Sequence, residues 1–558
     1  MEMTLSLPSR FCVLTIALFV SSATCAAATE LAEDTHWSGT VTVDEDVDIL
    51  AGVTLSIEAG TTVQSRSSVS IRVFGRLLAD GTESSPIRFT RHPDVSNWDR
   101  LLFINAADSR MTHCTVEFSD CEGDHKDYYD DTDPNCDPTT DRSPRDYFQA
   151  VVVIASHVDM DNCVFQNLPD TGSSAEGDAV AVISDDPEYP GAASAKIFEC
   201  QFLSIGQGIH TRYSYVLVEE CYFNDHNGDN DDVDLFGEST PPPLIRNNVF
   251  LDPAHDDMIN PTQCSAIIVG NVIAGSDDHG IVLRGRCEPV LINNLIYDCS
   301  SGGIAIQNSC DALLINNTIV DCGRGVRLFD HTGRWGRPYC LHPGSGRATL
   351  VNCIVWDCPT TLALTDSPYE KEPGSHLTLT HCDVQGGESL ASVSDNSTIT
   401  WGAGNIDADP LFVDATNGDF RVEEASPIVD AGTMDDAPDT DFYGGTRPCG
   451  KAIDIGAAEY GDCEPSVKRA FRRADANADS GVDVSDAIII LLRLFAGLAE
   501  LPCDKSADAD DSSDIDLSDA IFTLNYLFGQ GDAPSAPGVD CGVDPTEDAL
   551  TCVAYEGC

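Results

Sequence analysis

Short apolar segments recur at a constant interval through the middle of the chain. The phrases LIRNNVF, IIVGNVI, LINNLIY and LINNTIV place Asn248, Asn271, Asn294 and Asn317 at intervals of 23 residues, and LVNCIVW follows after an insertion. A fixed interval of this length is typical of a solenoid, in which each repeat forms one coil that stacks on the next. The pattern therefore predicts a stack of similar coils.

Each interval contains three short runs of alternating apolar and polar residues, such as PVLI, LIYD and GIAIQN, and turns separate these runs. Alternation is the period of a β-strand, and no run has helical spacing. Three strands per coil predict an all-β fold, a parallel β-helix, whose inward side chains stack from coil to coil. An inward column of asparagines can satisfy itself, because the amide carries both a donor and an acceptor.

Cysteines continue the asparagine column on both sides, at Cys114, Cys163, Cys200, Cys221, Cys353 and Cys382. Together these positions indicate about ten coils. Two more columns hold Cys264, Cys287 and Cys310, and then Cys299, Cys322 and Cys358. In-register parallel side chains rarely aim their Cβ atoms together, so we expect most of these thiols to be free and buried. Disulfides are expected among the loop and tail cysteines: Cys121 with Cys136, Cys449 with Cys463, and Cys503, Cys541, Cys552 and Cys558.

The three-strand coil and its asparagine column closely resemble the right-handed parallel β-helices of the pectate lyase and polygalacturonase superfamily. That superfamily has an asparagine ladder at the short turn between the second and third strands. The resemblance covers roughly residues 35 to 460 and implies a β-helix domain over residues 29–460, with an N-terminal cap at about 35–95. Residues at about 405–460, including ADPLFVDATNGDFRVEEASPIVDAGT, resemble a closing module of bacterial secreted β-helix proteins.

The N-terminus predicts export. Residues 1–28 contain Arg10, then the apolar run FCVLTIALFV, then the small residues SSATCAAA, which is the layout of a secretory signal peptide cleaved near Ala26 or Ala28. The apolar run is too short to span a bilayer, and no later segment is apolar for long enough to form a transmembrane helix. We therefore expect a secreted or extracellular protein, in which attachment to a cell surface would be indirect.

The charge balance excludes one class of partner. The chain has 92 acidic and 31 basic side chains, a formal net charge of -61. Such a chain repels nucleic acids and anionic membrane surfaces and attracts divalent cations. Scattered surface aspartates serve solubility, whereas ordered acidic clusters point to cation sites.

After Pro465 the strand pattern stops, and two acidic segments begin at Asp475 and Asp508, each followed by an amphipathic helical pattern. Their oxygen-bearing residues occupy positions 1, 3, 5, 7, 9 and 12 of a calcium loop, with a backbone carbonyl at position 7. The first set of predicted Ca²⁺ ligands is Asp475, Asn477, Asp479, Gly481, Asp483 and Asp486. The second set is Asp508, Asp510, Ser512, Asp514, Asp516 and Asp519.

The tandem loop–helix units, with aspartate at position 12, resemble the dockerin type I module, a small EF-hand-like helical domain. The resemblance implies a dockerin-like domain over residues 465–533, followed by a cysteine-containing tail at 534–558. It also implies a partner, either a cohesin-like domain or a cell-surface scaffold.

Three consecutive coils carry acidic turns, GDNDDVDL, AHDDMIN and SDDHGIVLRGR, and GRGVRLF follows two coils later. Their order resembles the NTD, DD, GHG and RIK blocks of polygalacturonase-type glycoside hydrolases. The match carries Asp231, Asp256 with Asp257, His279 and Arg327 onto the four blocks. By that resemblance Asp256 would be the general acid, Asp231 and Asp257 would hold the attacking water, and Arg327 would bind a sugar carboxylate.

Two alternatives to hydrolysis stay open. The same acidic stack could hold calcium for a pectate-type β-elimination, in which Arg284 or Arg286 removes a proton. The second, which we favour, is a calcium-binding, polysaccharide-associated protein without catalytic activity that the dockerin-like module attaches to a surface or complex, since aspartate also suits exposed turns. Nucleophile elbows, Walker loops and HExxH motifs are absent from the sequence. Single histidines such as His210 and His381 are interpreted as surface or ladder residues rather than ligands.

Overall fold

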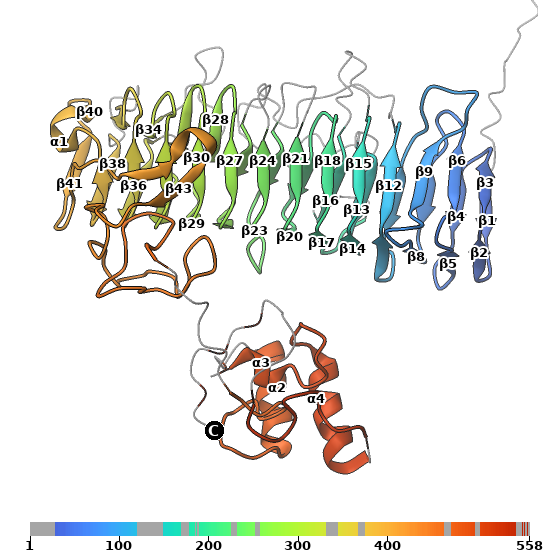
Figure 1. Ribbon diagram of the computed structural model, residues 1–558. Coiled ribbons are helices and arrows are strands. Elements are labelled where there is room, and N and C mark those ends of the chain that lie inside the picture. Colours follow the sequence, from blue (N-terminus) through green and yellow to red (C-terminus); the bar gives the residue numbers. More distant parts are fainter. Residues whose placement is uncertain are drawn as a thin grey trace, which may run out of the picture.

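The computed structural model shows a long stack of β-coils followed by a small helical module (Figure 1). It describes residues 28–119, 149–168, 178–184, 186, 189–224, 231–251, 257–330, 344–366, 374–461, 470–496, 501, 503–529, 531–542, 550, 552 and 555. Residues 1–27, almost all of the predicted signal peptide, lie outside this range. Among the described residues, no helix has the length and apolar character needed to cross a membrane.

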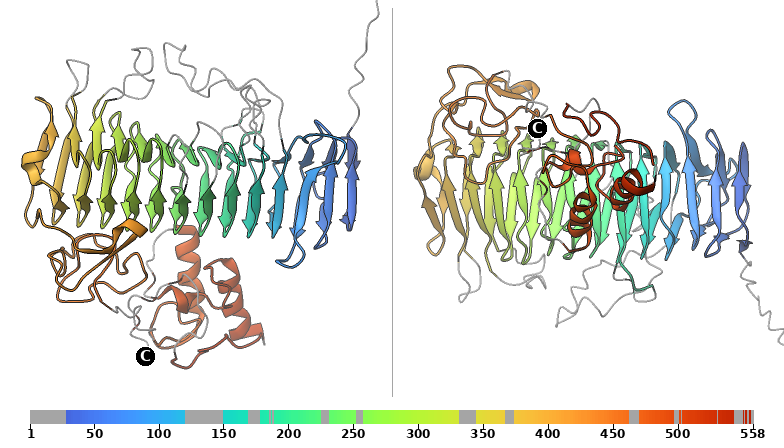
Figure 2. Two further views of the ribbon diagram at one scale, coloured as in Figure 1. Left: turned by 45° about the horizontal axis from the view of Figure 1, so that its top comes forward. Right: turned by 90° about the horizontal axis from the view of Figure 1, so that it is seen from below.

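Three parallel sheets run along the stack, and each coil except the last contributes one strand to each sheet (Figure 2). Sheet 1 contains β1 (Thr29–Leu31), β4 (Val47–Ile49), β7 (Ile71–Val73), β10 (Leu101–Ile104), β13 (Val151–Ile154), β16 (Val180–Ile183), β19 (Ile209–Arg212), β22 (Val233–Phe236), β25 (Ile259–Thr262), β28 (His279–Arg284), β31 (Gly302–Gln307), β34 (Val326–Phe329), β37 (Leu362–Leu364) and β40 (Ser392–Val393).

Sheet 2 contains β2 (Thr35–Trp37), β5 (Thr54–Ile57), β8 (Arg76–Asp80), β11 (Ser109–Thr112), β14 (His157–Asp161), β17 (Ser194–Phe198), β20 (Tyr215–Glu219), β23 (Leu244–Arg246), β26 (Ile267–Val269), β29 (Val290–Ile292), β32 (Asp311–Ile315), β35 (Arg347–Val351), β38 (His376–Thr380) and β41 (Thr398–Trp401). Sheet 3 contains β3 (Thr40–Val43), β6 (Thr62–Ser65), β9 (Ile87–Arg91), β12 (Cys114–Glu117), β15 (Val164–Gln166), β18 (Gln201–Leu203), β21 (Tyr222–Asn224), β24 (Val249–Leu251), β27 (Val272–Ala274), β30 (Leu295–Tyr297), β33 (Thr318–Val320), β36 (Ile354–Trp356) and β39 (Asp383–Val384). The predicted parallel β-helix is confirmed.

The core is the bore of the stack, and its side chains repeat from coil to coil. Phe165, Phe202, Phe223 and Phe250 form one such column in sheet 3, with ring centroids 5.0, 4.5 and 4.5 Å apart. Each ring is fully buried. Identical side chains stack in this way because parallel strands in register place equivalent Cβ atoms about one strand spacing, ~4.8 Å, apart.

The asparagine column forms the expected ladder at the turn between sheets 2 and 3. Asn271 Nδ2 donates to Asn294 Oδ1 at 2.9 Å and to the Ile245 carbonyl at 3.0 Å, and Asn271 N donates to the same Asn294 oxygen at 3.0 Å. Asn248 and Asn294 repeat the pattern, and all are fully buried. The ladder therefore satisfies the buried turn backbone from coil to coil.

The cysteines divide as expected between ladder and tail. The twelve described cysteines at ladder and column positions are free and buried, and in one column the sulfur atoms of Cys287 and Cys310 are 3.1 Å apart. Cys503 and Cys552 form a disulfide. Cys449 and Cys541 each take part in a further disulfide. Four cysteines of the expected bridges, Cys121, Cys136, Cys463 and Cys558, lie outside the described residues.

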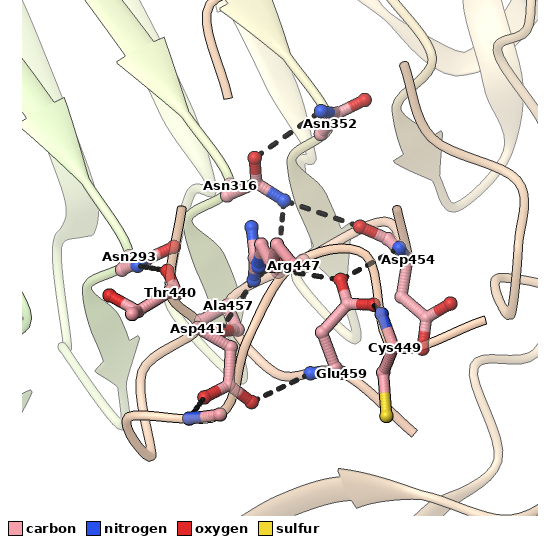
Figure 3. Close-up of polar contacts among 12 residues, drawn as sticks. Asn293, Asn316, Asn352, Thr440, Asp441, Arg447, Cys449, Asp454, Ala457 and Glu459 are labelled. Atoms are coloured by element: carbon pink, nitrogen blue, oxygen red, sulfur yellow. Dashed lines mark hydrogen bonds and ion pairs between the residues drawn. The ribbon is translucent and has the colours of Figure 1, made fainter. Parts of the chain in front are cut away.

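After β41 the chain turns back and packs along the side of the last coils. This segment contains β42 (Phe412–Asp414), η1 (Ala415–Asn417) and β43 (Asp419–Val422), and α1 (Gly387–Leu390) lies in the coil before β40. Asn316 Nδ2 donates to the carbonyls of Asp454 and Gly456 (Figure 3). Asn352 Nδ2 donates to the carbonyl of Thr433. The segment proposed as a closing module thus contacts the turns of the asparagine ladder.

One buried arginine organises this segment. Arg447 has a fully buried side chain, donates to the carbonyls of Gly456 and Ala457, and lies 3.3 Å from Glu459 (Figure 3). Burial lowers the pKa of Arg447 and raises that of Glu459. A buried ion pair of this kind fixes one arrangement of the surrounding loops, because breaking it would leave an unpaired buried charge.

The C-terminal module contains α2 (Val484–Ala496), α3 (Asp504–Ala507), α4 (Leu517–Leu524) and η2 (Asn525–Gly529). Asp516 caps α4, because its carboxylate accepts from Ser518 N while Asp519 accepts from Asp516 N in return. Ala487, Ile490 and Ala520 are buried in the small core of this module. The small core residues let the two helices and their loops pack closely.

Candidate functional site

The outer face of sheet 1 carries a row of buried polar side chains across three coils. In β22 the inward residues Val233 and Leu235 are fully buried in the bore, so Asp234 between them points outward. Its register partners are His210 in β19 and Asn260 in β25. His210 Nδ1 lies 3.0 Å from Asp234 Oδ2. The row is held together by bonds between neighbouring coils.

Asp257, which precedes β25, is the centre of a connected network. One of its oxygens lies 3.2 Å from His279 Nδ1, and the other accepts from Arg284 at 2.8 Å. Its backbone N–H donates to Asp231 at 3.3 Å, and the other oxygen of Asp231 accepts from Asn260 Nδ2 at 2.6 Å. The Asp257 side chain is 1% exposed. The Asp257 carboxylate is therefore buried between two nitrogen groups, one at each of its oxygens.

His279 is held as a cation. Burial, the largest influence, lowers its pKa, but the hydrogen bonds and charges of Asp257 and Asp278 together raise the pKa of His279 to about 9. Nδ1 faces both carboxylates, at 3.2 and 2.9 Å. Nε2 is buried and has no hydrogen-bond partner within the described residues. The imidazolium therefore has one N–H that is buried and unpaired among the described residues.

Oxygen and nitrogen atoms of Asp257, Asp278 and His279 lie within 4.8 Å of one another, close enough to share a metal ion. The chemistry of the donors does not fit calcium. Both Asp257 oxygens already bind cationic groups, His279 is protonated at neutral pH, and imidazole is a poor ligand for a hard ion. Arg284 donates to Asp257 and keeps its proton, so it does not fit the role of a base.

Arg327 lies on the same face, on β34, two coils beyond His279. Its guanidinium stacks over the Phe329 ring at 3.8 Å, and Phe329 packs with Val282 and Ala305 on the outside of the sheet. Burial and then the neighbouring charge of Arg324 lower the pKa of Arg327, while Asp278 raises it. Arg327 makes no ion pair within the described part of the chain. Its charge is therefore available to an anionic ligand.

The structure thus brings Asp231, Asp257 and His279 together and places Arg327 further along the same face. Asp256, predicted as the general acid, lies outside the described residues. His210 is not a surface residue: it is buried beside Asp234, and sequence interpretation missed it. Its signal was the alternation in GIHTRYS, which puts His210 outward and in line with the acidic coils.

The first acidic loop is folded by its own first and last carboxylates. Asp475 accepts from the backbone N–H groups of Asp479 and Ser480, at 3.1 and 3.0 Å. Asp486 accepts from those of Asn477 and Asp483, at 3.2 and 2.7 Å. These bonds curl the loop so that positions 1 and 12 meet inside it.

The second loop repeats this pattern. Asp508 accepts from the N–H groups of Ser512 and Ser513 at 2.9 and 3.0 Å, and Asp519 from those of Asp510 and Asp516 at 3.3 and 2.8 Å. The same bonds therefore recur 33 residues later in the chain.

The donors of both loops fit calcium. All are hard oxygens, and carboxylate oxygens of Asp508, Asp510 and Asp519 lie within 4.8 Å of one another. Burial raises the pKa of Asp486 to about 6 and that of Asp519 to about 7. One buried oxygen of Asp510 has no hydrogen bond within the described residues. Crowded, buried carboxylates of this kind are stabilised by a bound cation.

A family model described as a right-handed beta helix region matches residues 233–406, which include the coils of the polar network. Together with the three parallel sheets, this match identifies the domain as a right-handed parallel β-helix. A comparison with curated protein sequences gives no match.

Several solved structures are similar. The periplasmic alginate epimerase AlgG is 12% identical, with 67% of this chain and 77% of that chain covered and a TM-score of 0.32. The pectate lyase Pel9A is 14% identical, with 74% and 89% covered and a TM-score of 0.35. A tailspike protein of E. coli bacteriophage HK620 is 11% identical, with 67% and 74% covered and a TM-score of 0.37. At such values the likeness carries no argument about activity.

Proposed function

We propose that this chain is a secreted β-helix protein that binds an acidic polysaccharide on the outer face of sheet 1. We further propose that a calcium-binding, dockerin-like C-terminal module attaches it to a surface or complex. The observation that carries the first part is the network of Asp231, Asp257, His279 and Arg284, with Arg327 on the same face. These groups converge on one outer surface and supply both acceptors and cationic donors.

The arrangement suits a sugar chain with carboxylate groups. The chain as a whole is strongly acidic, yet Arg327, Arg324 and the imidazolium of His279 are gathered on this side of the stack. A carboxylate on a sugar would meet Arg327, and the hydroxyl groups would meet Asp231. Coils repeat about every 4.8 Å, so an extended polymer can contact several coils in succession.

Hydrolysis is the second candidate function. Glycoside hydrolases use two carboxyl groups, one as acid and one as base. Asp231 and Asp257 are joined through the Asp257 N–H, and the Asp257 carboxylate is held by His279 and Arg284. The imidazolium supplies a proton donor beside them. The lyase alternative has less support. The groups around Asp257 do not suit a calcium ion, and Arg284 does not suit the role of a base.

Binding and turnover can be separated in one experiment. The mature chain is assayed on polygalacturonate, alginate and neutral dextran, with calorimetry for binding and with reducing ends and absorbance of unsaturated products for cleavage. We expect binding to the two uronate polymers and at least about a tenfold weakening in Arg327→Met, because a charge-assisted bond is lost. Arg421→Met, which removes an exposed arginine from β43, is the matched control.

New reducing ends that disappear in Asp257→Asn would establish the hydrolase. Unsaturated products would overturn our assignment in favour of the lyase. Equal binding of dextran and polygalacturonate would refute the acidic-glycan proposal.

The C-terminal module exposes a repeated apolar surface suited to a protein partner. Ile488 and Phe495 on α2 are 49% and 74% exposed, and Ile521 and Phe528, 33 residues later in each case, are also 49% and 74% exposed. Apolar side chains this exposed are typical of interaction sites. A cohesin-like domain or surface scaffold is the partner we propose for them.

The test is binding of the full chain to immobilised cohesin domains, in calcium and in EDTA. We expect calcium-dependent capture that Phe495→Ser with Phe528→Ser abolishes. Leu390→Ser, which alters an equally exposed apolar side chain on α1, should leave capture unchanged. Capture that survives both EDTA and the double substitution would contradict the proposed docking surface.

A further inference from the structure

The two acidic loops have the same number of carboxylates at the side-chain ligand positions 1, 3, 5, 9 and 12, but their surroundings are unequal. These carboxylates are Asp475, Asp479, Asp483 and Asp486 in the first loop and Asp508, Asp510, Asp516 and Asp519 in the second, which also contains Asp511 and Asp514. Their internal hydrogen bonds also match. The groups that contact the carboxylate at position 1 from outside the loop differ between the two loops.

The C-terminal tail contacts the first loop. The Tyr555 hydroxyl donates to Asp475 Oδ2 at 2.5 Å, and Tyr555 itself is buried, edge-on to Phe471 with ring centroids 6.4 Å apart. The Cys503–Cys552 disulfide ties the tail to the module three residues before Tyr555. The Tyr555 hydroxyl is thus an uncharged hydrogen-bond donor to the Asp475 carboxylate at position 1, and this bond holds the carboxylate in one orientation.

The second loop meets a cation at the equivalent carboxylate. Arg473 has a fully buried side chain, its NH1 group donates to the Asp508 carbonyl at 2.9 Å and lies 3.7 Å from Asp508 Oδ2, and its NH2 group lies 2.8 Å from Asp511. A guanidinium is always charged. The Arg473 guanidinium repels a divalent ion in the second loop, and it competes with that ion for the negative charge of Asp508.

We propose that Tyr555 and Arg473 make the two calcium sites unequal, so that the first loop, completed by the tail, binds calcium more tightly than the second. This inference rests on the proposed calcium binding by the module. Groups that orient a metal-binding side chain without touching the metal typically change affinity by about 10- to 100-fold. Tyr555 is therefore a positioning residue of the first site.

The experiment is a calorimetric titration of the full, EDTA-treated and dialysed chain with calcium chloride. Asp508→Ala leaves the first loop alone, and Asp475→Ala leaves the second. We expect calcium affinity at least about tenfold higher in the Asp508→Ala chain than in the Asp475→Ala chain. Adding Tyr555→Phe should weaken the first loop about tenfold and leave the second within a factor of about two.

Two further variants keep the outcome decisive. Cys503→Ser with Cys552→Ser releases the tail and should weaken the first loop as much as Tyr555→Phe does. Tyr222→Phe, in β21 of the β-helix, is the matched control and should change neither loop. Equal weakening of both loops by Tyr555→Phe would show a general structural effect and overturn the proposal.

Failure of the two proposals is distinguishable. A native chain that binds no calcium would refute the calcium-binding module itself. Two calcium ions bound with equal affinity, or no effect of Tyr555→Phe on the first loop, would leave the module standing and refute the inequality.

Discussion

His279 should make the stability of the β-helix depend on pH. Burial lowers its pKa, but Asp257 and Asp278 raise the value from 6.5 to about 9 overall. The difference, 9 − 6.5, corresponds to about 3 kcal/mol at about 1.4 kcal/mol per unit. Because the folded pKa is above the unfolded one, this contribution is fully present below pH 6.5 and is lost as the pH rises through 9.

The measurement is urea unfolding of the native chain and of His279→Gln at several pH values across that window. The native chain should lose about 3 kcal/mol more than His279→Gln, whose side chain does not titrate. His36→Gln, at an exposed histidine beside Glu58, should behave as the native chain does. The same pH dependence in all three chains, or a His279 ring resonance that titrates near its ordinary pKa, would refute the reasoning.

Three other predictions follow from the ladder, the loops and the thiols. Asn294→Ala leaves the Asn271 N–H unpaired in the core and removes the side-chain donor to the Ile268 carbonyl, and it should cost about 3 kcal/mol in urea unfolding. Asn405→Ala at the half-buried ladder end should cost less, and equal costs would contradict the ladder account. EDTA should lower the thermal midpoint of the C-terminal module and leave the β-helix transition in place, as calorimetry would show; a single shifted transition would contradict this. Iodoacetamide should label the twelve ladder thiols only after unfolding, and mass spectrometry showing native labelling would contradict their burial.

The coil architecture could be predicted because the ladder has a constant interval. Asn248, Asn271, Asn294 and Asn317 have no insertions between them, so sequence spacing translates directly into stacking. The same constant interval predicted that the ladder cysteines are free and buried. Local rules were sufficient here because every coil repeats the same strand and turn.

The site was harder to predict because loops of different length precede the strands of sheet 1. Asn260 bonds to Asp231 across 29 residues, whereas His279 meets Asp257 across 22, so no single interval relates the partners. His210 was missed for this reason. Tyr555 and Asp475 are 80 residues apart and meet only through the fold of the tail, which no local pattern reveals.

The buried thiols set an order of events during folding. Twelve free cysteines lie inside the stack, and Cys287 and Cys310 are already neighbours across one coil. In the oxidising compartment that we propose for this chain, an unfolded molecule would expose all of them to disulfide exchange. Coils must therefore stack faster than oxidants react, and once stacked they shield their own sulfur atoms. Rapid stacking of each coil on its neighbour, which a repetitive solenoid permits, thus protects the thiols from disulfide exchange.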